Sequence, residues 1–237
     1  MEERDKLSER RGRSEDRSEE VYYERYWQLQ RKELALDDPT TDIRWRFLAS
    51  TLSQQSFGSI LDAGCGDGWW TAQLHKRGYQ VVGMDISRGA LDAARRRYPH
   101  LAFERYPLDR ARWPFRAGQF DAVFASEVIE HVYDVRTMFA EMNRVLRHGG
   151  LLILTTPYHG LIKALLIVLF GFERHFDVEG AHVRFFTVRS CRAILEKYGF
   201  QVKKVRYYGR IRPISKGMFI VALKASDVQL TGGLSSE

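Results

Sequence analysis

A glycine-rich segment after residue 59 has the residue types and spacing of a cofactor-binding turn. An apolar run ends at Asp62, glycines follow at every second position, and a helical pattern begins at Trp69. Glycine permits the backbone angles of a tight strand-to-helix turn and lets a ligand approach the main chain. The amide groups of the first helical turn then face that ligand. The segment predicts a nucleoside-cofactor loop, with candidate contacts at Asp62, Gly64, Cys65, Gly66 and Gly68.

The spacing of the glycines separates two classes of cofactor. A dinucleotide loop has the pattern G-x-G-x-x-G, in which the third glycine allows the helix to pack closely on the strand. Here Trp69 stands three positions after Gly66, where the dinucleotide pattern needs glycine. Asp62, at the end of the apolar run, suits a cation better than a phosphate. The loop therefore favours a positively charged nucleoside without phosphate, and we expect S-adenosylmethionine.

Two further carboxylates follow later apolar runs. Asp85 stands about twenty residues after the glycine loop, where a carboxylate can accept both ribose hydroxyls, with Ile86 beside it as a further contact. The alternative role for Asp85 is the N-cap of the next helix, a role for which Ser87 is equally suited. Asp109 could accept the adenine amino group while Leu108 packs on the ring.

The elements that must position these residues alternate along the chain. Apolar runs predict strands over 59–63, 79–84, 101–105, 119–125 and 150–156, and helical patterns over 67–77, 87–98 and 134–147 separate most of them. Strands alternating with helices of this length indicate βαβ units and a parallel sheet in an α/β fold. Ligands bind such sheets beyond the carboxyl ends of the strands. Two amphipathic helices, 22–36 and 42–54, precede the first strand.

Composition indicates one folded domain between two tails. The chain has 237 residues, 44% of them hydrophobic, which suffices for one substantial core. Residues 1–20 are almost wholly charged, serine or glycine, and predict a disordered tail. We expect a single domain over 21–225 and a flexible tail over 226–237.

Charge and cysteine content narrow the classes of function. The net charge of +7 would suit a nucleic acid or an anionic membrane. The basic residues are scattered, however, so we expect a solvated surface and no nucleic-acid partner. Cys65 and Cys191 are too few for a disulfide framework or a cysteine metal site. With no apolar secretion signal at the N-terminus, we expect a cytoplasmic location.

The order of these motifs resembles that of class I S-adenosylmethionine-dependent methyltransferases. The resemblance covers about residues 40–224. It implies a Rossmann-like, seven-stranded, mostly parallel sheet with helices on both faces and an antiparallel last strand, for which Met218–Lys224 is the candidate. The residues that carry it are the glycine loop, Asp85, Leu108-Asp109, Trp113-Pro114-Phe115, Phe120-Asp121-Ala122-Val123 and Arg144-Val145-Leu146-Arg147-His148-Gly149-Gly150.

A second set of residues resembles the quinone-biosynthesis O-methyltransferases. The set comprises Glu127–Val132, Thr156-Pro157-Tyr158 and Ala181–Phe186. The resemblance implies transfer of a methyl group to a hydroxyl of an apolar or prenylated phenol. It also implies that Arg44 contacts the carboxylate of the cofactor. Ser126 is a further candidate cofactor contact, at a position where the quinone enzymes place a larger apolar residue against the adenine.

Other acceptors and roles remain open. Thr156–Gly160 also resembles methyltransferases of sugars and small metabolites, whose acceptor atom is oxygen or nitrogen. An RNA methyltransferase and a non-catalytic cofactor-binding protein are further alternatives, because fold alone does not define function.

Residues 157–186 form an insert whose segment Leu161–Phe170 is apolar except for Lys163. This segment is about half as long as a bilayer span. A helix of this kind packs in the core, covers an apolar substrate or lies on a membrane surface. The quinone resemblance favours peripheral membrane contact through 161–172, since quinone precursors carry isoprenoid tails.

Histidine and glutamate residues after the fourth strand could do the chemistry. His131 is the leading candidate for a general base towards a hydroxyl acceptor, with His182 and His159 as second choices, because neutral imidazole is available at pH 7. Glu130 is the third catalytic candidate. Glu127, Glu130 and His131 could instead hold a divalent metal that orients the acceptor. The alternative is structural, with Glu130 at the start of a helix and stabilised by its dipole.

Overall fold

A computed structural model of the chain describes residues 21, 24, 38–54, 58–176 and 182–228. The expected N-terminal tail over 1–20, most of the expected helix over 22–36 and the last part of the C-terminal tail lie outside the described residues. Residues 226–228 lie on the domain, because Asn143 Nδ2 donates to the carbonyl of Ser226 at 2.9 Å and Val228 packs against the core. The folded body therefore extends past the expected boundary at residue 225.

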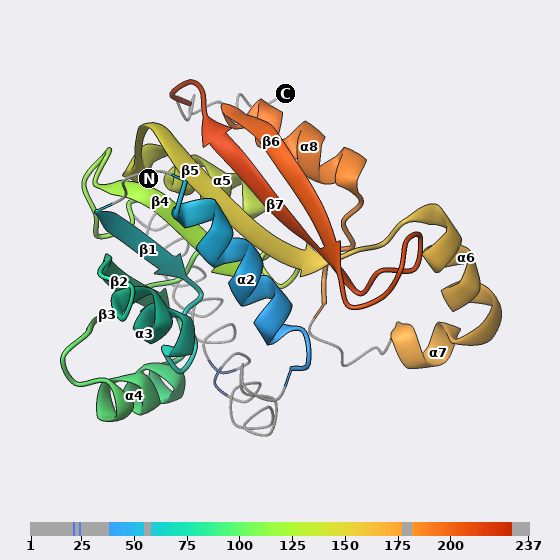
Figure 1. The fold of residues 1–237 in the computed structure, drawn as a ribbon, viewed down its shortest axis with the longest axis horizontal. Helices are drawn as coiled ribbons and strands as arrows, with labels where there is room; N and C mark the ends of the chain where they lie inside the picture. Colours follow the sequence, from blue (N-terminus) through green and yellow to red (C-terminus); the bar gives the residue numbers. More distant parts are fainter. Residues whose placement is uncertain (1–20, 22–23, 25–37, 55–57, 177–181, 229–237) are drawn as a thin grey trace, which may run out of the picture.

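Seven strands form one sheet in the order β3-β2-β1-β4-β5-β7-β6 (Figure 1). Strands β1 to β5 pair in parallel, whereas β7 pairs antiparallel with both β5 and β6. The expected Rossmann-like methyltransferase fold, with Met218–Lys224 in the antiparallel strand, is confirmed. The strands are β1 Ser59–Ala63, β2 Gln80–Asp85, β3 Ala102–Arg105, β4 Phe120–Ser126, β5 Leu146–Pro157, β6 Phe200–Tyr208 and β7 Gly217–Lys224.

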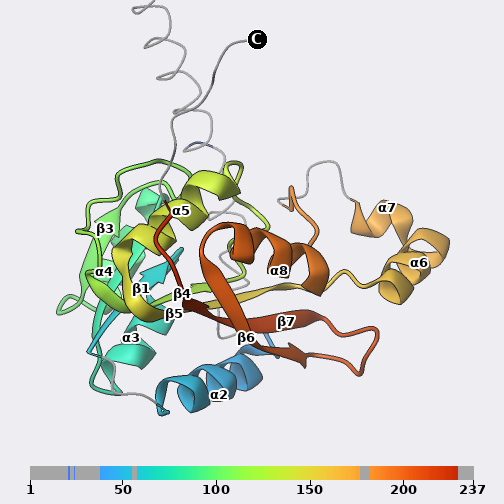
Figure 2. The same cartoon turned by 90° about the horizontal axis from the view of Figure 1, so that it is seen from above.

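Helices cover both faces of the sheet. In Figure 2, α2 (Thr41–Leu52) and α3 (Trp69–His75) lie on one face, and α5 (Val135–Val145) and α8 (Val188–Lys197) lie on the other. The helix α4 (Arg88–Arg97) packs through Leu91 and Ala94 against Phe103 of β3. Successive strand residues point to opposite faces, so Ile60 packs with the α2 and α3 residues while Leu61 packs with those of α5.

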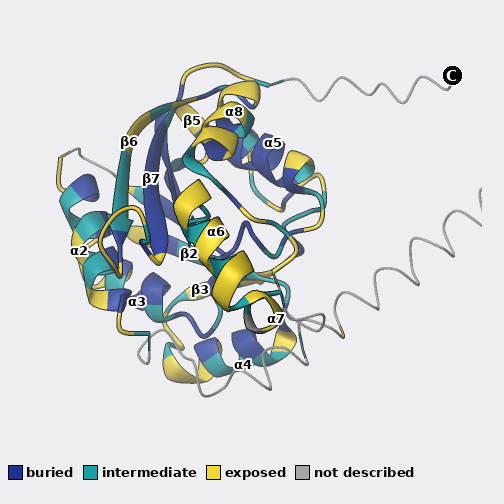
Figure 3. Ribbon diagram, turned by 90° about the vertical axis from the view of Figure 1, so that its right-hand side faces the viewer, coloured by how far each residue is buried: buried dark blue, intermediate teal, exposed yellow. Residues whose placement is uncertain are grey.

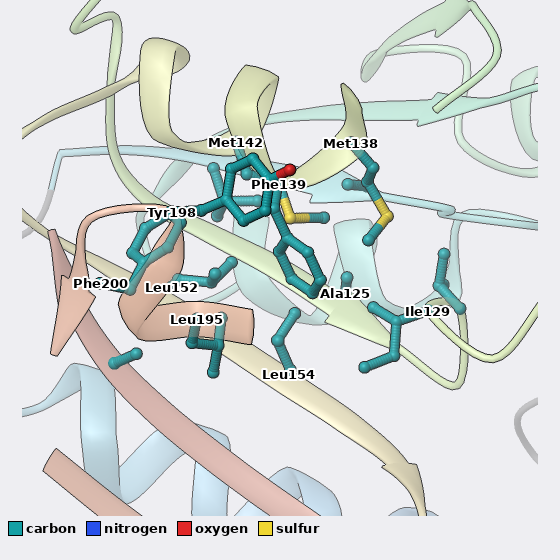
Figure 4. Close-up of a cluster of buried hydrophobic side chains, with 14 of the residues drawn as sticks. Ala125, Ile129, Met138, Phe139, Met142, Leu152, Leu154, Leu195, Tyr198 and Phe200 are labelled. Atoms are coloured by element: carbon teal, nitrogen blue, oxygen red, sulfur yellow. The ribbon is translucent and has the colours of Figure 1, made fainter. Parts of the chain in front are cut away.

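The larger hydrophobic cluster lies between α5, α8 and the middle strands. Figure 4 shows Phe139 and Met142 of α5 directed toward Leu152 and Leu154 of β5, with Leu195 of α8 beside them. The central strands read as continuous apolar runs because helices bury both of their faces. This core fixes the strand ends, and with them the loops that carry the candidate site.

Local signals explain where several helices begin. The side chain of Ser87 accepts the amide of Ala90 at the start of α4, and Asp134 accepts two amides at the start of α5. A side-chain oxygen in this position satisfies amide groups that have no partner within the helix. The predicted strands over 59–63, 79–84, 101–105 and 119–125 match β1 to β4 within one residue. The helix predicted over 134–147 ends at Val145, and β5 begins at once rather than at residue 150.

Two elements were not predicted from the sequence, α8 and the strand β6. The strand β6 is an edge strand with several exposed polar positions, including Gln201 and Lys203, so its sequence lacks a long apolar run. The sheet therefore depends on β7 to recruit β6 by antiparallel pairing.

The apolar insert forms α6 (Leu161–Phe170) and the short α7 (Phe172–His175), which project from one end of the sheet (Figure 1). No residue of α6 is buried. The core-helix alternative is therefore wrong. In the described part of the chain no helix is long and apolar enough to cross a membrane.

Candidate functional site

The glycine loop connects β1 to α3 in a conformation that requires glycine. Gly64, Gly66 and Gly68 all have positive φ, at 80°, 53° and 77°. A Cβ atom on Gly64 would lie 2.5 Å from Cγ2 of Val128, and such an approach would force the neighbouring loop to move. The loop is tied to β2, since the amides of Gly64 and Cys65 both donate to the carbonyl of Met84. The predicted binding loop is thus present at the carboxyl end of β1.

Asp62 lies beneath this loop and is buried. Thr71 of α3 donates its hydroxyl to Asp62 Oδ2 at 2.6 Å. Burial, with a further contribution from the charge of Asp85, raises the pKa of Asp62 to about 7, although the Thr71 hydroxyl opposes the shift. The carboxyl group therefore joins β1 to α3. The expectation that Asp62 contacts the cofactor remains a proposal.

Asp85 holds the glycine loop from the neighbouring strand. Its Oδ2 accepts the amide of Gly66 at 2.9 Å, and its Oδ1 accepts the amide of Ser87 at 2.9 Å. The side chain of Ser87 caps α4. The alternative in which Asp85 is the N-cap of α4 is therefore wrong, because Ser87 is the N-cap. Glu24 comes close as well, since it accepts the hydroxyl of Ser87 and the amide of Gly89.

Burial chiefly raises the pKa of Asp85, partly offset by these amide donors. The carboxylate thus stands at the carboxyl end of β2, beside the loop, where the predicted ribose contact requires it.

Asp109 and Leu108 follow β3 on the same edge of the sheet. Leu108 packs against the main core, and its carbonyl accepts Nε1 of Trp113 at 3.3 Å. The turn Trp113–Phe115 is held by α5, because buried Glu141 accepts the amide of Trp113 at 2.7 Å. Burial raises the pKa of Asp109. Ile86 is half-buried beside Asp85, and its carbonyl accepts Nε of Arg105 at 3.1 Å.

Arg44 of α2 reaches the end of β4. Its side chain is buried, and Nη1 donates to Ser126 Oγ at 2.9 Å. Nη2 forms an ion pair with Asp38 at 2.7 Å. The guanidinium lies 5.5 Å from the ring centroid of Trp70, a distance typical of a cation–π contact. Arg44 and Ser126, predicted separately as cofactor contacts, are thus brought together.

The turn after β4 presents the candidate catalytic residues. Glu130 lies in this turn and not at a helix start, because α5 begins at Val135 behind its cap Asp134. The dipole explanation for Glu130 is therefore wrong. Its Oε2 accepts the hydroxyl of Thr156 at 3.0 Å, and no hydrogen-bond partner for its Oε1 is found among the described residues. Burial, reinforced by the charge of Glu127, raises the pKa of Glu130 well above its usual range.

His182 joins Glu130 and His131, which lie side by side. The His131 and His182 rings are 4.8 Å apart between centroids, and His131 Nε2 lies 3.9 Å from Glu130 Oε1. In the part of the chain that the structure describes, these three residues are the group of potential metal ligands that is found, with ligand atoms within 4.8 Å of one another. Two of the three residues predicted as metal ligands, Glu130 and His131, belong to it.

Glu127, the third predicted metal ligand, is engaged elsewhere. Its Oε1 accepts the hydroxyl of Tyr208 at 2.6 Å and that of Thr155 at 2.8 Å, and Arg44 lies 4.0 Å away. It has a φ of 55°, which is rare for a residue with a side chain. The structure thus replaces Glu127 by His182 in the candidate ligand set and assigns Glu127 to the surroundings of Arg44.

Residues 182–186 cover the turn after β4. The amides of Val183 and Arg184 donate to the carbonyl of Glu130 at 3.0 and 3.1 Å, and Arg184 Nε donates to the carbonyl of Val132. His159 stands apart from the His131 group and pairs with His175 of α7 through their Nε2 atoms at 3.1 Å. Burial lowers the pKa of His159 to about 4. His159 therefore helps to anchor the insert.

Sequence reasoning missed several residues that support the site. Thr71 fixes Asp62, Thr156 fixes Glu130, and Asp38 fixes Arg44. Thr71 and Asp38 are single polar residues without a recognisable motif, and Thr156 belongs to a motif that assigned it no role. Each gains its role from a partner that is distant in sequence or on another element. Trp70 carried a signal of its own, as an aromatic residue in the first turn of the helix after the glycine loop.

Comparisons with known proteins agree with this geometry. Residues 61–154 match a family model described as a methyltransferase domain. The chain is 32% identical to the mitochondrial ubiquinone biosynthesis O-methyltransferase of Homo sapiens, over 62% of this chain and 42% of that protein. It is 39% identical to the malonyl-[acyl-carrier protein] O-methyltransferase of Legionella pneumophila, over 41% of this chain and 35% of that protein. The matches span about a third to a half of the length of these curated relatives.

Solved structures show the same fold. The geranyl diphosphate C-methyltransferase of Streptomyces coelicolor, solved with Mg²⁺, geranyl diphosphate and S-adenosyl-L-homocysteine, matches with a TM-score of 0.60 and 18% identity, over 78% of this chain and 77% of that chain. At this identity the likeness concerns the fold. The family match and the curated relatives, one of which is named as a probable S-adenosylmethionine-dependent methyltransferase, confirm the resemblance seen in the sequence and the expected cofactor, S-adenosylmethionine.

The raised pKa of Asp62 predicts a pH-dependent stability. As the pH rises from the usual Asp value of 3.8 to about 7, the unfolded chain loses its proton while the folded chain keeps it, so the free energy of unfolding falls. Asp62→Asn removes this loss and keeps an acceptor for Thr71. Relative to the wild type, the variant should gain on the order of 2–4 kcal/mol between pH 5 and pH 8 in urea unfolding. Asp92→Asn, an exposed control on α4, should show no such gain, and an equal difference at both pH values for Asp62→Asn would contradict the assignment.

Proposed function

We propose that this chain is an enzyme that uses S-adenosylmethionine to methylate a small-molecule acceptor, because residues 61–154 match a family model described as a methyltransferase domain. The acceptor group we propose is a hydroxyl of an apolar or prenylated phenol. The observation that carries the proposal is the arrangement at the carboxyl edge of the sheet. The glycine loop held by Asp85, the Arg44–Ser126 contact at the end of β4, and the group of Glu130, His131 and His182 in the turn after β4 all follow strands that end at this edge.

The cofactor side has donors and acceptors matched to the two ends of S-adenosylmethionine. Asp85 provides a half-buried carboxylate for the ribose hydroxyls, and Asp109 with Leu108 provides an acceptor and an apolar contact for the adenine. At the other end Arg44 provides a buried cation for the amino-acid carboxylate. Its Nε has no hydrogen-bond partner among the described residues, so it has a donor left for a ligand. The backbone of the glycine loop, where a Cβ on Gly64 would lie 2.5 Å from Val128, lies beside Asp85, which accepts the amide of Gly66.

When bound, S-adenosylmethionine supplies an activated methyl group on a sulfonium, so the protein contributes mainly orientation and proton removal. His131 is half-buried and next to Glu130, whose pKa is raised well above its usual range by burial and by the charge of Glu127. A neutral imidazole in this position takes the proton of a phenolic hydroxyl, and the carboxyl of Glu130 lies beside the imidazole. Thr156 and the main chain of Val183 hold Glu130 in place.

A divalent cation fits the same three residues. Two imidazoles and one carboxylate form a mixed nitrogen and oxygen donor set, and the unpartnered Oε1 of Glu130 is free to ligate. A cation there would favour the ionised form of Glu130 and would orient a catechol-like acceptor. The geranyl diphosphate C-methyltransferase with the same fold was solved with Mg²⁺, which supports testing this possibility.

The relatives also favour a second class of acceptor. Malonyl-[acyl-carrier protein] O-methyltransferases of two bacteria match this chain over 41% and 45% of its length. Because acceptor recognition depends on the insert and on residues 182–186, this match supports the reaction type more strongly than the acceptor. Sugar and other small-metabolite acceptors belong to the same test.

We also propose that α6 makes peripheral contact with a membrane. Leu161, Leu169 and Phe170 are 76%, 69% and 81% exposed, and Figure 3 colours α6 as exposed and intermediate, with no buried residue. Clusters of exposed apolar side chains on one helix mark an interaction surface. The neighbouring loop between β6 and β7 adds exposed Ile211 between Arg210 and Arg212 (Figures 1 and 2). Apolar residues flanked by cations suit an anionic lipid surface.

Cofactor binding tests the proposal first. The wild type should bind S-adenosylmethionine in calorimetry, and Asp85→Asn should weaken binding about 10- to 100-fold, because it loses a charged acceptor and a support of the loop. Asp92→Asn, which makes the same change on α4, is the matched control. A methyl-transfer screen should include catechols, prenylated phenols, sugars, malonyl thioesters and RNA. Failure of the wild type to bind the cofactor, or transfer to RNA alone, would overturn the proposal.

His131 should affect the chemical step and not cofactor binding. His131→Asn should lower kcat by about 10²- to 10⁴-fold and leave the dissociation constant for S-adenosylmethionine unchanged. The control is His100→Asn, which makes the same change at an exposed position just before β3. Exhaustive chelation separates the two roles of the cluster. Activity that is lost and restored by Mg²⁺ supports the metal, and unchanged activity excludes it while leaving His131 as the base.

Membrane contact can be measured by flotation of the intact protein with vesicles. We expect binding to vesicles that contain phosphatidylglycerol and weaker binding to phosphatidylcholine alone. Phe170→Glu should reduce flotation at least about tenfold, because a carboxylate is costly to bury in lipid. Ala117→Glu introduces the same charge on an exposed loop before β4 and should have little effect. Absence of wild-type flotation at both low and moderate salt would refute this contact.

A further inference from the structure

Asp38 lies just before α2 and joins three parts of the fold. Its Oδ2 accepts Arg44 Nη2 at 2.7 Å, and its Oδ1 accepts Lys216 Nζ at 3.0 Å. The amide and the hydroxyl of Thr40 also donate to Oδ1, each at 2.9 Å. Lys216 belongs to the loop before β7, 178 residues away in sequence. One carboxylate therefore links the start of α2, Arg44 and the far end of the sheet.

Arg44 is held in one orientation by these contacts. Nη2 is directed to Asp38, with Thr41 Oγ1 at 3.3 Å, and Nη1 is directed to Ser126. A buried arginine whose terminal nitrogens are bonded in different directions cannot rotate without breaking charge-assisted hydrogen bonds. Its Nε is buried and has no partner within the described residues. The fixed guanidinium thus keeps one N–H that only a further acceptor can satisfy.

We propose that Asp38 is a positioning residue for cofactor binding, which acts through Arg44 and is itself fixed by Lys216. This inference rests on the proposed function, in which Arg44 binds the amino-acid carboxylate of S-adenosylmethionine. Asp38 makes no contact with that carboxylate in the proposal. It presents the guanidinium in the orientation that leaves Nε available.

The charges around Asp38 distinguish positioning from simple competition. A carboxylate next to Arg44 could compete with an anionic ligand, and removing it would then tighten binding. Lys216, however, offsets the charge of Asp38, so the pair contributes little net charge at the distance of the ligand. Burial raises the pKa of Asp38, but the Thr40 amide, Lys216 and Arg44 lower it further, so the pKa lies below its usual value and the group is ionised at neutral pH. The effect of Asp38 on ligand binding that we expect is therefore its effect on the orientation of Arg44.

The test compares two ligands that differ in the part that Arg44 would bind. S-adenosylmethionine carries the amino-acid carboxylate, whereas 5′-methylthioadenosine shares the nucleoside and sulfur but lacks it. In calorimetry, Asp38→Asn should weaken S-adenosylmethionine binding about tenfold, the equivalent of one lost charge-assisted hydrogen bond. Binding of 5′-methylthioadenosine should stay as in the wild type. Asp42→Asn, on the exposed side of the first turn of α2, is the matched control and should change neither.

A charge-balanced variant separates orientation from electrostatics. Asp38→Asn combined with Lys216→Met removes one negative and one positive charge, so the net charge near the ligand is unchanged. Positioning predicts that the double variant keeps the loss of S-adenosylmethionine affinity. Recovery of wild-type affinity would assign the effect to charge and overturn the inference.

Other outcomes also decide against Asp38. Unchanged or tighter S-adenosylmethionine binding by Asp38→Asn would show that Arg44 needs no such support. An equal loss for both ligands would indicate a general structural defect. Failure of the underlying function looks different, because the wild type would then bind no S-adenosylmethionine, or Arg44→Met would bind it as tightly as the wild type.

Discussion

The parallel direction of β1 to β5 is the constraint on which the candidate site depends. Because these strands pair in parallel, each of them ends at the same edge of the sheet, and the loops that follow meet there. Asp62, Asp85 and Ser126 are each the last or next-to-last residue of a strand. The reversed strand β7 then closes the other side and brings Tyr208 and Lys216 to the same edge. Residues more than 150 positions apart in sequence are neighbours for this reason.

Burial of charged groups at this edge gives the site its chemical character. A carboxylate taken out of water is costly unless donors surround it, and the site uses three different solutions. Asp85 is held by two main-chain amides, Asp62 by one hydroxyl and a raised pKa, and Glu130 by one hydroxyl with one oxygen left unpartnered. The three carboxyls therefore differ in their hydrogen-bond donors and in spare hydrogen-bonding capacity. Those differences support a binding role for Asp85 and a proton-donating or ligating role for Glu130.

The insert after β5 is held to the domain by polar contacts and not by hydrophobic packing. Its helix α6 has an apolar composition typical of a core, yet it lies outside the hydrophobic clusters of the domain. Its root is fixed instead by polar contacts, since Lys163 donates to the carbonyls of Tyr158 and Lys216 and His159 pairs with His175. A rigidly anchored helix with an exposed apolar surface suits contact with something outside the chain. Lys216 accepts Lys163 through its carbonyl and donates to Asp38 through its side chain. The insert and the surroundings of Arg44 therefore both depend on contacts with Lys216.

The sequence by itself determined the cofactor loop, most of the strands and the fold class, because these depend on local patterns. Glycine spacing around Gly66 and the carboxylates that end apolar runs can be read without knowing any distant contact. Edge strand β6 lacked such a pattern, and it exists because β7 pairs with it. The composition of the candidate metal set, with His182 in place of Glu127, was decided by tertiary structure alone.

The same holds for Glu127 and Asp38. Glu127 precedes Val128 in the turn after β4. Hydrogen bonds from the hydroxyls of Tyr208 and Thr155 direct its side chain towards Arg44. Asp38 gains its role from Lys216, and Thr156 gains its role from Glu130, through hydrogen bonds between separate elements. A sequence shows which residues are able to make such bonds. The direction in which each side chain points is fixed by packing of the whole sheet, and so only the folded chain decides which of them meet.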